Sequence, residues 1–174
     1  MNPFDNCPTY ETVRFTLRLV TPGDAADLLA CYREPAQSTI YNSDNCDYGY
    51  GMQTEDEMRG AIERWLEEYR ERCFIRYTVT DRETSGAIGT IEVFPGFKPE
   101  NMPIHGVLRI DLRREYETTD ILTELMMLTD TLFAPFDCEK IVTRVSPDAP
   151  ERIIAAEKCG FHPYPGFRSG YYVK

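Results

Sequence analysis

Ala156-Glu157-Lys158-Cys159-Gly160-Phe161 is the stretch that decides the fold, because a helix ends in it and a strand begins directly after it. The helix is predicted to start at Asp148-Ala149-Pro150-Glu151 and to end at Cys159-Gly160. Gly160 suits the residue after a helix, where the backbone often turns left-handed. Phe161 to Phe167 and Gly170 to Val173 then form a predicted pair of short strands.

Working back along the chain, strands and helices alternate. The β-branched stretch from Glu139 to Val145 predicts a strand, and Thr118 to Phe133 predicts a helix with one apolar face. Further strands are predicted from Cys73 to Thr80, Ala87 to Phe94 and His105 to Leu112. The first two form an antiparallel hairpin about a polar turn. This alternation predicts a mixed α/β (α+β) sheet with helices on its faces.

The N-terminal part begins with a predicted strand from Val13 to Val20. Thr21 then caps a helix that runs from Pro22 to Arg33. Thr54-Glu55-Asp56-Glu57 is a capping box, so a second helix is predicted from Glu55 to Arg72. Residues 35–53 between these helices form a long polar and aromatic loop, which is either functional or an irregular connection.

The chain has 174 residues, which suits a single domain over residues 1–174. Its net charge of −10 excludes nucleic acid as the main partner and suits a cationic substrate, although a solvated acidic surface gives the same charge. No apolar run is long enough to span a membrane, and the N-terminus lacks a signal peptide pattern. Six cysteines without a C-x-x-C pair predict free thiols in a reducing cytoplasm and no metal site.

Four segments together resemble the GNAT N-acetyltransferase superfamily, and in particular its ribosomal-protein N-terminal acetyltransferase branch. The first two are the N-terminal strand and helix cap Phe15 to Asp24 and the strand Ser85-Gly86-Ala87-Ile88-Gly89-Thr90-Ile91. The others are the spacing from Leu132-Phe133 to Glu139-Lys140-Ile141 and the helix end Ala156 to Phe161. The resemblance implies a GNAT-like, mostly antiparallel central sheet of about six to seven strands flanked by about four helices. It also implies an acyl-CoA-dependent N-acyltransferase with acetyl-CoA as co-substrate.

The segment that corresponds to the family's cofactor loop is atypical. In the family, glycines in this loop let the backbone approach the pyrophosphate, which binds at a helix N-terminus. Here Leu112-Arg113-Arg114-Glu115-Tyr116-Glu117-Thr118-Thr119-Asp120 contains no glycine. The arginines and threonines could hold phosphates instead, or Thr118 or Thr119 only caps the helix and the arginines are solvated. The resemblance gives these cofactor-binding candidates: Ile110, Leu112, Arg113, Arg114, Thr118, Thr119 and Asp120.

The catalytic candidates are Glu92 and Tyr164. Glu92 shares a strand face with Thr90 and Phe94, and a carboxylate beside apolar groups can have a raised pKa, as a general base needs. Asp111 is the runner-up, unless it only pairs with Arg109. Many relatives carry a tyrosine where this chain has Ala156, so Tyr164 is the substitute proton donor for the leaving thiolate. Alternatively, Glu92 is an exposed carboxylate on a strand and Tyr164 is an ordinary aromatic residue of the last hairpin.

Three functions remain open on the sequence. The first is acyl transfer to a primary amine of a small molecule or a protein N-terminus, with the donor in the cleft between the strands His105 to Leu112 and Glu139 to Val145. The second is a non-catalytic GNAT-like binding module that has lost coenzyme A and keeps its cleft or a homodimer surface. The third is an enzyme that uses another acyl carrier.

Overall fold

The computed structural model of the chain describes residues 2–33, 51–98 and 103–174. Most of the predicted 35–53 loop therefore lies outside the described residues. The strands are β1 (Tyr10–Glu11), β2 (Phe15–Leu19), β3 (Ile75–Asp81), β4 (Ala87–Phe97), β5 (His105–Leu112), β6 (Lys140–Arg144), β7 (His162–Pro163) and β8 (Tyr171–Val173). The α-helices are α1 (Ala25–Tyr32), α2 (Glu55–Arg70), α3 (Thr119–Met126), α4 (Thr129–Phe133) and α5 (Pro150–Lys158), with short 3₁₀ turns η1 (Pro22–Asp24) and η3 (Arg114–Tyr116).

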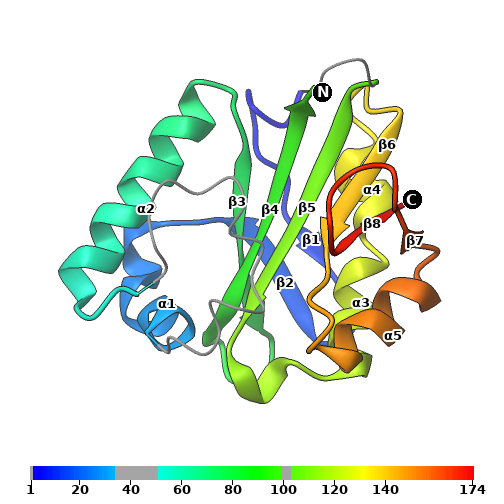
Figure 1. Cartoon of the computed structure of the whole chain (residues 1–174). Coiled ribbons are helices and arrows are strands. Elements are labelled where there is room, and N and C mark those ends of the chain that lie inside the picture. The colour runs from blue at the N-terminus through cyan, green and yellow to red at the C-terminus, as the bar shows by residue number, and fades with distance from the viewer. Residues whose placement is uncertain (1, 34–50, 99–102) are drawn as a thin grey trace.

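The described strands form one open sheet in the order β1-β2-β3-β4-β5-β6-β8-β7 (Figure 1). All neighbouring strands are antiparallel except β5 and β6, which are parallel. The predicted mixed, mostly antiparallel sheet is therefore confirmed. The strand count is slightly higher than expected, because the short edge strand β1 carries no alternation long enough to predict it.

Two helix predictions need correction. The helix expected from Thr118 to Phe133 is divided into α3 and α4, and the hydroxyl group of the buried Thr129 donates a 2.5 Å hydrogen bond to the Met126 carbonyl at the break. A side chain that takes a backbone acceptor in this way competes with the helical hydrogen bonds. The helix expected from Pro22 begins as the η1 turn and becomes α-helical only at Ala25.

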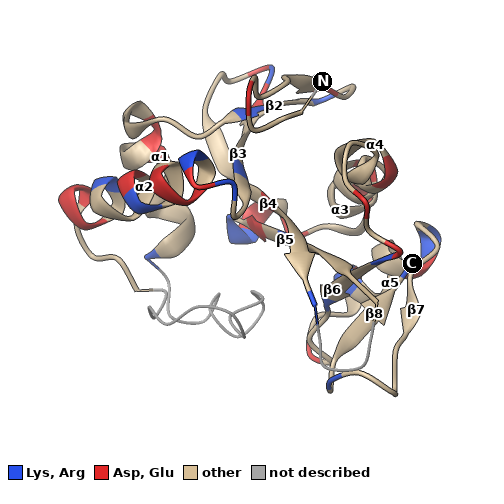
Figure 2. Cartoon of the chain, turned by 90° about the horizontal axis from the view of Figure 1, so that it is seen from above, with Lys and Arg blue, Asp and Glu red and all other residues tan. Residues whose placement is uncertain are grey.

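The predicted capping box at α2 is confirmed. The Glu57 amide donates to Thr54 Oγ1 at 3.2 Å, and the Thr54 amide donates to the Glu57 carboxylate at 3.1 Å. Acidic and basic residues follow one another along the outer side of this helix (Figure 2). Its inner side packs against α1 and contributes Met58 and Ile62 to the core.

Helices cover both faces of the sheet. Figure 2 shows α1 and α2 on one side and α3 and α4 on the other. The larger core cluster joins α3, α4 and α5 to alternate residues of the central strands, such as Tyr77, Ile91 and Ile110. Because successive strand residues point to opposite faces, the residues between them point toward α1 and α2. Several of those are polar and buried, and they form the centre of the candidate site.

Candidate active site

Three charged side chains form a row across the centre of the sheet. Arg76 of β3 lies opposite Glu92 of β4, and Glu92 lies opposite Arg109 of β5. Arg76 Nη2 donates to Glu92 Oε2, and Arg109 Nη1 lies 3.4 Å from each Glu92 oxygen. All three residues are buried, with exposed fractions of 1% for Arg76, 7% for Glu92 and 3% for Arg109. The row holds one carboxylate between two guanidinium groups.

A second row lies two residues further along β4 and β5, on the same face of the sheet, and Arg76 contacts both rows. Thr90 of β4 lies opposite Asp111 of β5. Asp111 Oδ2 accepts hydrogen bonds from the Tyr32 hydroxyl group at 2.7 Å and from Arg76 Nη1 at 3.1 Å. We call Arg76, Thr90, Glu92, Arg109 and Asp111 the charged ladder. The helices complete it, because α1 supplies Tyr32 and α2 places the Trp65 ring 4.4 Å from the Arg76 guanidinium carbon.

The ladder corrects two expectations about the catalytic candidates. Glu92 was expected beside apolar groups, but its carboxylate contacts two guanidinium groups instead. For Asp111, the runner-up base, the alternative was a pairing with Arg109, and its ion pair in the structure is with Arg76. Sequence reasoning missed Arg76, because an arginine that alternates with apolar residues in a strand also fits a solvated face. Only the cover provided by α1 and α2 makes this position buried.

The parallel strands β5 and β6 pair over three residues only, from His105 opposite Lys140 to Val107 opposite Val142. The five residues of β5 that follow have no partner on β6, so a gap opens between the two strands. Ile110 faces this gap, since its carbonyl accepts a 2.6 Å hydrogen bond from Arg152 Nη2 on α5 rather than from β4. In an antiparallel pair a residue's amide and carbonyl point to the same side. The Ile110 amide therefore also faces the gap.

Arg152 is a second residue that sequence reasoning did not select for this position. It is 3% exposed, and it makes two further bonds to Glu117, from Nε to Oε2 at 2.8 Å and from Nη2 to Oε1 at 2.5 Å. Glu117 lies between η3 and α3, in the predicted cofactor segment. The two partners are 35 positions apart in the sequence, which explains why no local pattern revealed the pair.

The predicted cofactor residues divide into three groups. Ile110 and Leu112 bury their side chains in the larger core, so only their main chain can meet a ligand. Arg113 Nη2 donates to the Asp27 carbonyl of α1 at 2.8 Å, whereas Arg114 is exposed. Thr118, Thr119 and Asp120 form the start of α3.

The N-terminus of α3 has open amides that favour an anion, and Asp120 in its first turn, whose charge opposes one. Thr118 is its N-cap residue and makes no side-chain capping bond, so the capping role considered for it is not seen. Within the described residues, the first amides of the helix, those of residues 119–121, donate to no acceptor. Open amides at a helix N-terminus bind phosphate groups. A phosphate group could therefore be held at this end of the helix.

Tyr164 lies in a different group of side chains from Glu92. The centre of its ring lies 5.9 Å from the ring centre of His105 and 5.5 Å from that of Phe167. Its hydroxyl oxygen accepts a 3.2 Å hydrogen bond from Lys140 Nζ. His105 is four residues before Arg109 on β5, which is roughly 13 Å along a strand. Tyr164 is thus near the paired end of β5 and β6. Its catalytic role stays a prediction.

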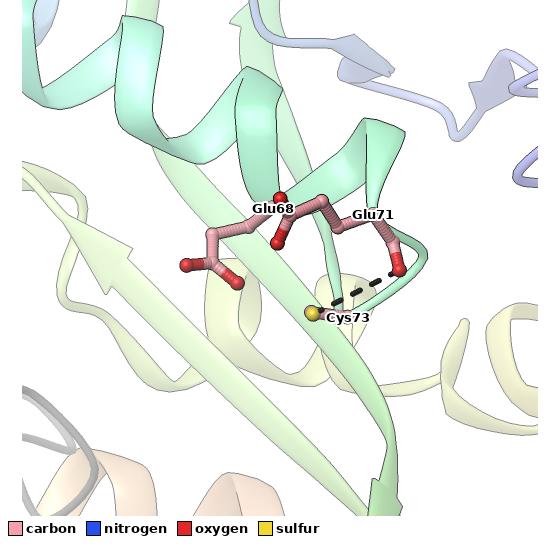
Figure 3. Close-up of side chains that lie close together, drawn as sticks. All are labelled: Glu68, Glu71 and Cys73. Carbon is pink, nitrogen blue, oxygen red and sulfur yellow. Dashed lines mark hydrogen bonds between the residues drawn. The ribbon is translucent and has the colours of Figure 1, made fainter.

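Glu68, Glu71 and Cys73 are close enough together to offer three metal ligands at the end of α2 (Figure 3). Both carboxylates are exposed. Burial, the Glu68 carboxylate and the nearby charge of Glu71 raise the pKa of the Cys73 thiol. Exposed acidic groups commonly lie close together without holding a metal. We assign no metal to this group.

Among the described residues, none of the helices has the length and apolar character needed to cross a membrane. The predicted cytoplasmic location stays a prediction.

The chain resembles known acetyltransferases in sequence and in fold. A protein of Bacillus subtilis (strain 168), the uncharacterized N-acetyltransferase YoaA, is 30% identical over 84 residues, which is 48% of this chain and 44% of that protein. The match thus spans less than half of that curated relative. The ribosomal-protein-S5-alanine acetyltransferase of Vibrio fischeri superposes with a TM-score of 0.69 at 14% identity, over 96% of each chain. The spermidine N-acetyltransferase of Vibrio cholerae, solved with CoA and spermine, gives 0.66 at 18% identity, over 88% of this chain and 83% of that one.

At these identities the two solved structures establish a shared fold. The family model described as an acetyltransferase (GNAT) domain matches residues 14–162, which covers the ladder, the β5–β6 gap and the start of α3. The chain therefore belongs to the GNAT acetyltransferase family.

Proposed function

We propose that this chain is an N-acyltransferase that takes its acyl group from an acyl-CoA, with acetyl-CoA as the expected donor. One observation carries the proposal. The buried carboxylate of Glu92 lies next to Ile91, and Ile91 is the register partner of Ile110, whose backbone faces the β5–β6 gap. A proton acceptor on β4 and a backbone donor on the neighbouring strand β5 therefore lie one residue apart in register, and the donor faces the gap. Amine acylation needs such a pair.

The residues expected to hold the donor come from two places. The amides at the start of α3, with Arg114, Thr118 and Thr119 close by in the chain, would bind its phosphates. The Ile110 amide would donate to its carbonyl oxygen, which gains negative charge during the reaction. When bound, the donor supplies a thioester: the amine nitrogen forms a bond to its carbonyl carbon, the C–S bond breaks, and the departing thiolate takes up a proton.

Glu92 is the proposed general base that removes the proton from the attacking amine. A carboxylate has about four acceptor positions on its two oxygens. Arg76 uses one and Arg109 lies at hydrogen-bonding distance from both oxygens, so roughly one position is left for an amine. The two guanidinium groups also hold the carboxylate in one orientation, which favours a well-placed proton transfer.

Tyr164 remains the proposed donor of a proton to the thiolate. Its oxygen acts as acceptor in the bond from Lys140, so that bond leaves the phenolic proton available. Because roughly 13 Å of β5 separate Tyr164 from a group beside Arg109, the proton would pass to the thiolate through intervening water rather than by direct contact. A Tyr164→Phe variant that keeps its full rate at every pH would remove this residue from the mechanism.

The proposed acceptor is a primary amine of a small molecule or of a protein N-terminus. The net charge of −10 favours a cationic acceptor. The names of two solved relatives include spermidine and a ribosomal protein, and both types of acceptor suit this charge.

The direct test is to incubate the purified chain with acetyl-CoA and a panel of spermidine and of short peptides that begin with alanine or serine. Free thiol release is followed with a chromogenic disulfide, and products are identified by mass spectrometry. We expect amine-dependent thiol release with an acetylated product of at least one panel member. Thermal-shift titration with acetyl-CoA serves as the companion measurement.

One observation favours the second function, a binding module without catalysis. Arg152 occupies the Ile110 carbonyl inside the gap, and a chain that never binds a donor would show this closed arrangement. Absence of any thermal shift at millimolar acetyl-CoA, together with absence of thiol release, would support the module and contradict the enzyme. The predicted homodimer would then be tested by sedimentation.

A further inference from the structure

The side chain of Arg152 reaches from α5 to β5 and joins three elements. It donates to the Ile110 carbonyl of β5 and pairs through two bonds with Glu117, which directly precedes the α3 cap residue. We call Arg152, Glu117 and the Ile110 carbonyl the clasp. The guanidinium group is almost fully buried, with a side-chain exposure of 3%, and the Glu117 side chain is 10% exposed.

The clasp satisfies a backbone group that the divergence of β6 would otherwise leave open. A buried carbonyl without a donor is costly, so some group has to meet it. In this arrangement Arg152 is that group, and Glu117 balances its charge. A ligand that lies along β5 in the gap would need the same backbone edge and the space that this side chain fills. Arg152 and such a ligand therefore exclude one another.

We propose that the clasp is a gate for the acyl donor: donor binding requires Arg152 to leave the Ile110 carbonyl, so the closed clasp weakens donor affinity. This inference rests on the proposed function, since it assigns the β5–β6 gap to the donor. It goes further by naming the side chains that control entry.

The expected size of the effect follows from population arithmetic. When only a fraction of molecules can bind, the apparent dissociation constant is the intrinsic one divided by that fraction. Three charge-assisted hydrogen bonds in a buried setting keep the open form a minor one. Removal of the clasp is therefore expected to tighten acetyl-CoA binding by about tenfold or more.

The test compares charge-neutral double variants by calorimetric titration with acetyl-CoA. Arg152→Ala with Glu117→Gln removes the clasp without changing the net charge next to the phosphates. Arg14→Ala with Glu124→Gln is the control. It removes another arginine–carboxylate pair, which joins Glu124 of α3 to Arg14, the residue before β2. We expect the clasp variant to bind at least about tenfold more tightly than the wild type, and the control to bind as the wild type does.

Other outcomes have distinct meanings. Unchanged affinity in the clasp variant would overturn the gate and leave the acyltransferase standing. Weaker binding would also overturn it, since Arg152 would then contact the donor itself. Absence of binding in every protein would contradict both the gate and the proposed function.

A second variant and a second readout cover a folding defect. Arg152→Lys keeps the net charge but cannot form the two-pronged contact with Glu117, so it should shift affinity in the same direction by a smaller factor. In the ligand-free wild type, amide hydrogen exchange of residues 108–112 should be slower than in either clasp variant. Equal exchange rates would contradict a closed clasp.

Discussion

Arg76 and Glu92 form an ion pair in the middle of the sheet, and their side chains are 2% and 9% exposed. The same guanidinium group also pairs with Asp111 at 3.1 Å. Arg76 thus pairs with two carboxylates of the charged ladder, that of Glu92, the proposed general base, and that of Asp111.

Replacing Arg76 should be the most destabilising single change in the ladder. Arg76→Leu leaves two buried carboxylates without this partner, and breaking a buried ion pair in this way costs about 3–5 kcal/mol. Urea unfolding followed by circular dichroism measures the loss. The control is Arg72→Ala, which removes an exposed pair with Asp5 and should cost about 0–1 kcal/mol. Equal losses in the two variants would show that burial of the ladder does not matter for stability.

Asp24 predicts a specific pH dependence. Burial raises the pKa of its carboxyl group, but hydrogen bonds from Arg18, the Thr21 amide and Thr78 outweigh burial and lower the pKa below its ordinary value. A carboxyl group with a lowered pKa in the folded state stabilises the fold above the unfolded pKa of about 3.9. This stabilisation is lost as the pH falls through the folded-state pKa.

Asp24→Asn should therefore be less stable than the wild type at pH 7, and the difference should shrink as the pH falls below about 4. Unfolding free energies at several pH values measure it. Asp5→Asn is the control, since Asp5 pairs with Arg72 on the surface and both side chains are more than half exposed. A difference between Asp24→Asn and the wild type that stays constant with pH would contradict the account.

Two glycines should respond to alanine with opposite signs. A Cβ atom at Gly89 would press against the Asp111 carbonyl oxygen and lie 2.8 Å from the Leu112 Cα atom, both of which are backbone atoms of β5. Gly89→Ala should therefore destabilise the fold by about 1–3 kcal/mol, as overpacking does. At Gly60 in α2, the nearest atom is a flexible arginine end at 3.7 Å.

Gly60→Ala should accordingly stabilise the fold by about 0.5–1 kcal/mol, because alanine suits a helix interior better than glycine. Melting temperatures of both variants test the pair. If Gly89→Ala melted at or above the wild-type temperature, the close approach of β4 to β5 at this point would be refuted.

Thr54→Ala tests the capping box. Loss of the hydroxyl group leaves the Glu57 amide without its acceptor, so the free energy of unfolding should fall by about 0.5–2 kcal/mol. Glu57→Ala removes the carboxylate that accepts from both the Thr54 and the Gln53 amides, so it should also lower the free energy of unfolding. If Thr54→Ala left the free energy of unfolding unchanged, the capping box would not contribute to the stability of α2.

Local signals explain what the sequence could reveal. The capping box of α2 depends on residues three apart, and Gly160 ends α5 with a positive φ of 88° as expected. The strands predicted from Ala87 to Phe94 and from His105 to Leu112 correspond to β4 and β5. The break between α3 and α4 was missed, because Thr129 fits an apolar helical pattern as well as the hydrogen bond that interrupts it.

The site was harder to predict because its contacts join distant segments. Glu92 was found through its strand, but its partners Arg76 and Arg109 lie 16 and 17 residues away, and Arg76 resembles a surface residue in the sequence. Arg152 and Glu117 meet only once β5, α3 and α5 are assembled. A charged residue on the inner side of a short helix is the signal that could have drawn attention to Arg152.

The measurement that tests the central claim most directly is the rate of acetyl transfer by Glu92→Gln, with the acceptor that the amine panel identifies. General bases contribute roughly 100- to 10,000-fold to rates, so kcat/KM should fall about tenfold or more. Glu124→Gln, which alters an arginine-paired carboxylate on α3, should keep the wild-type rate. Acetyl transfer by Glu92→Gln at the wild-type rate would contradict the assignment of Glu92 as the base.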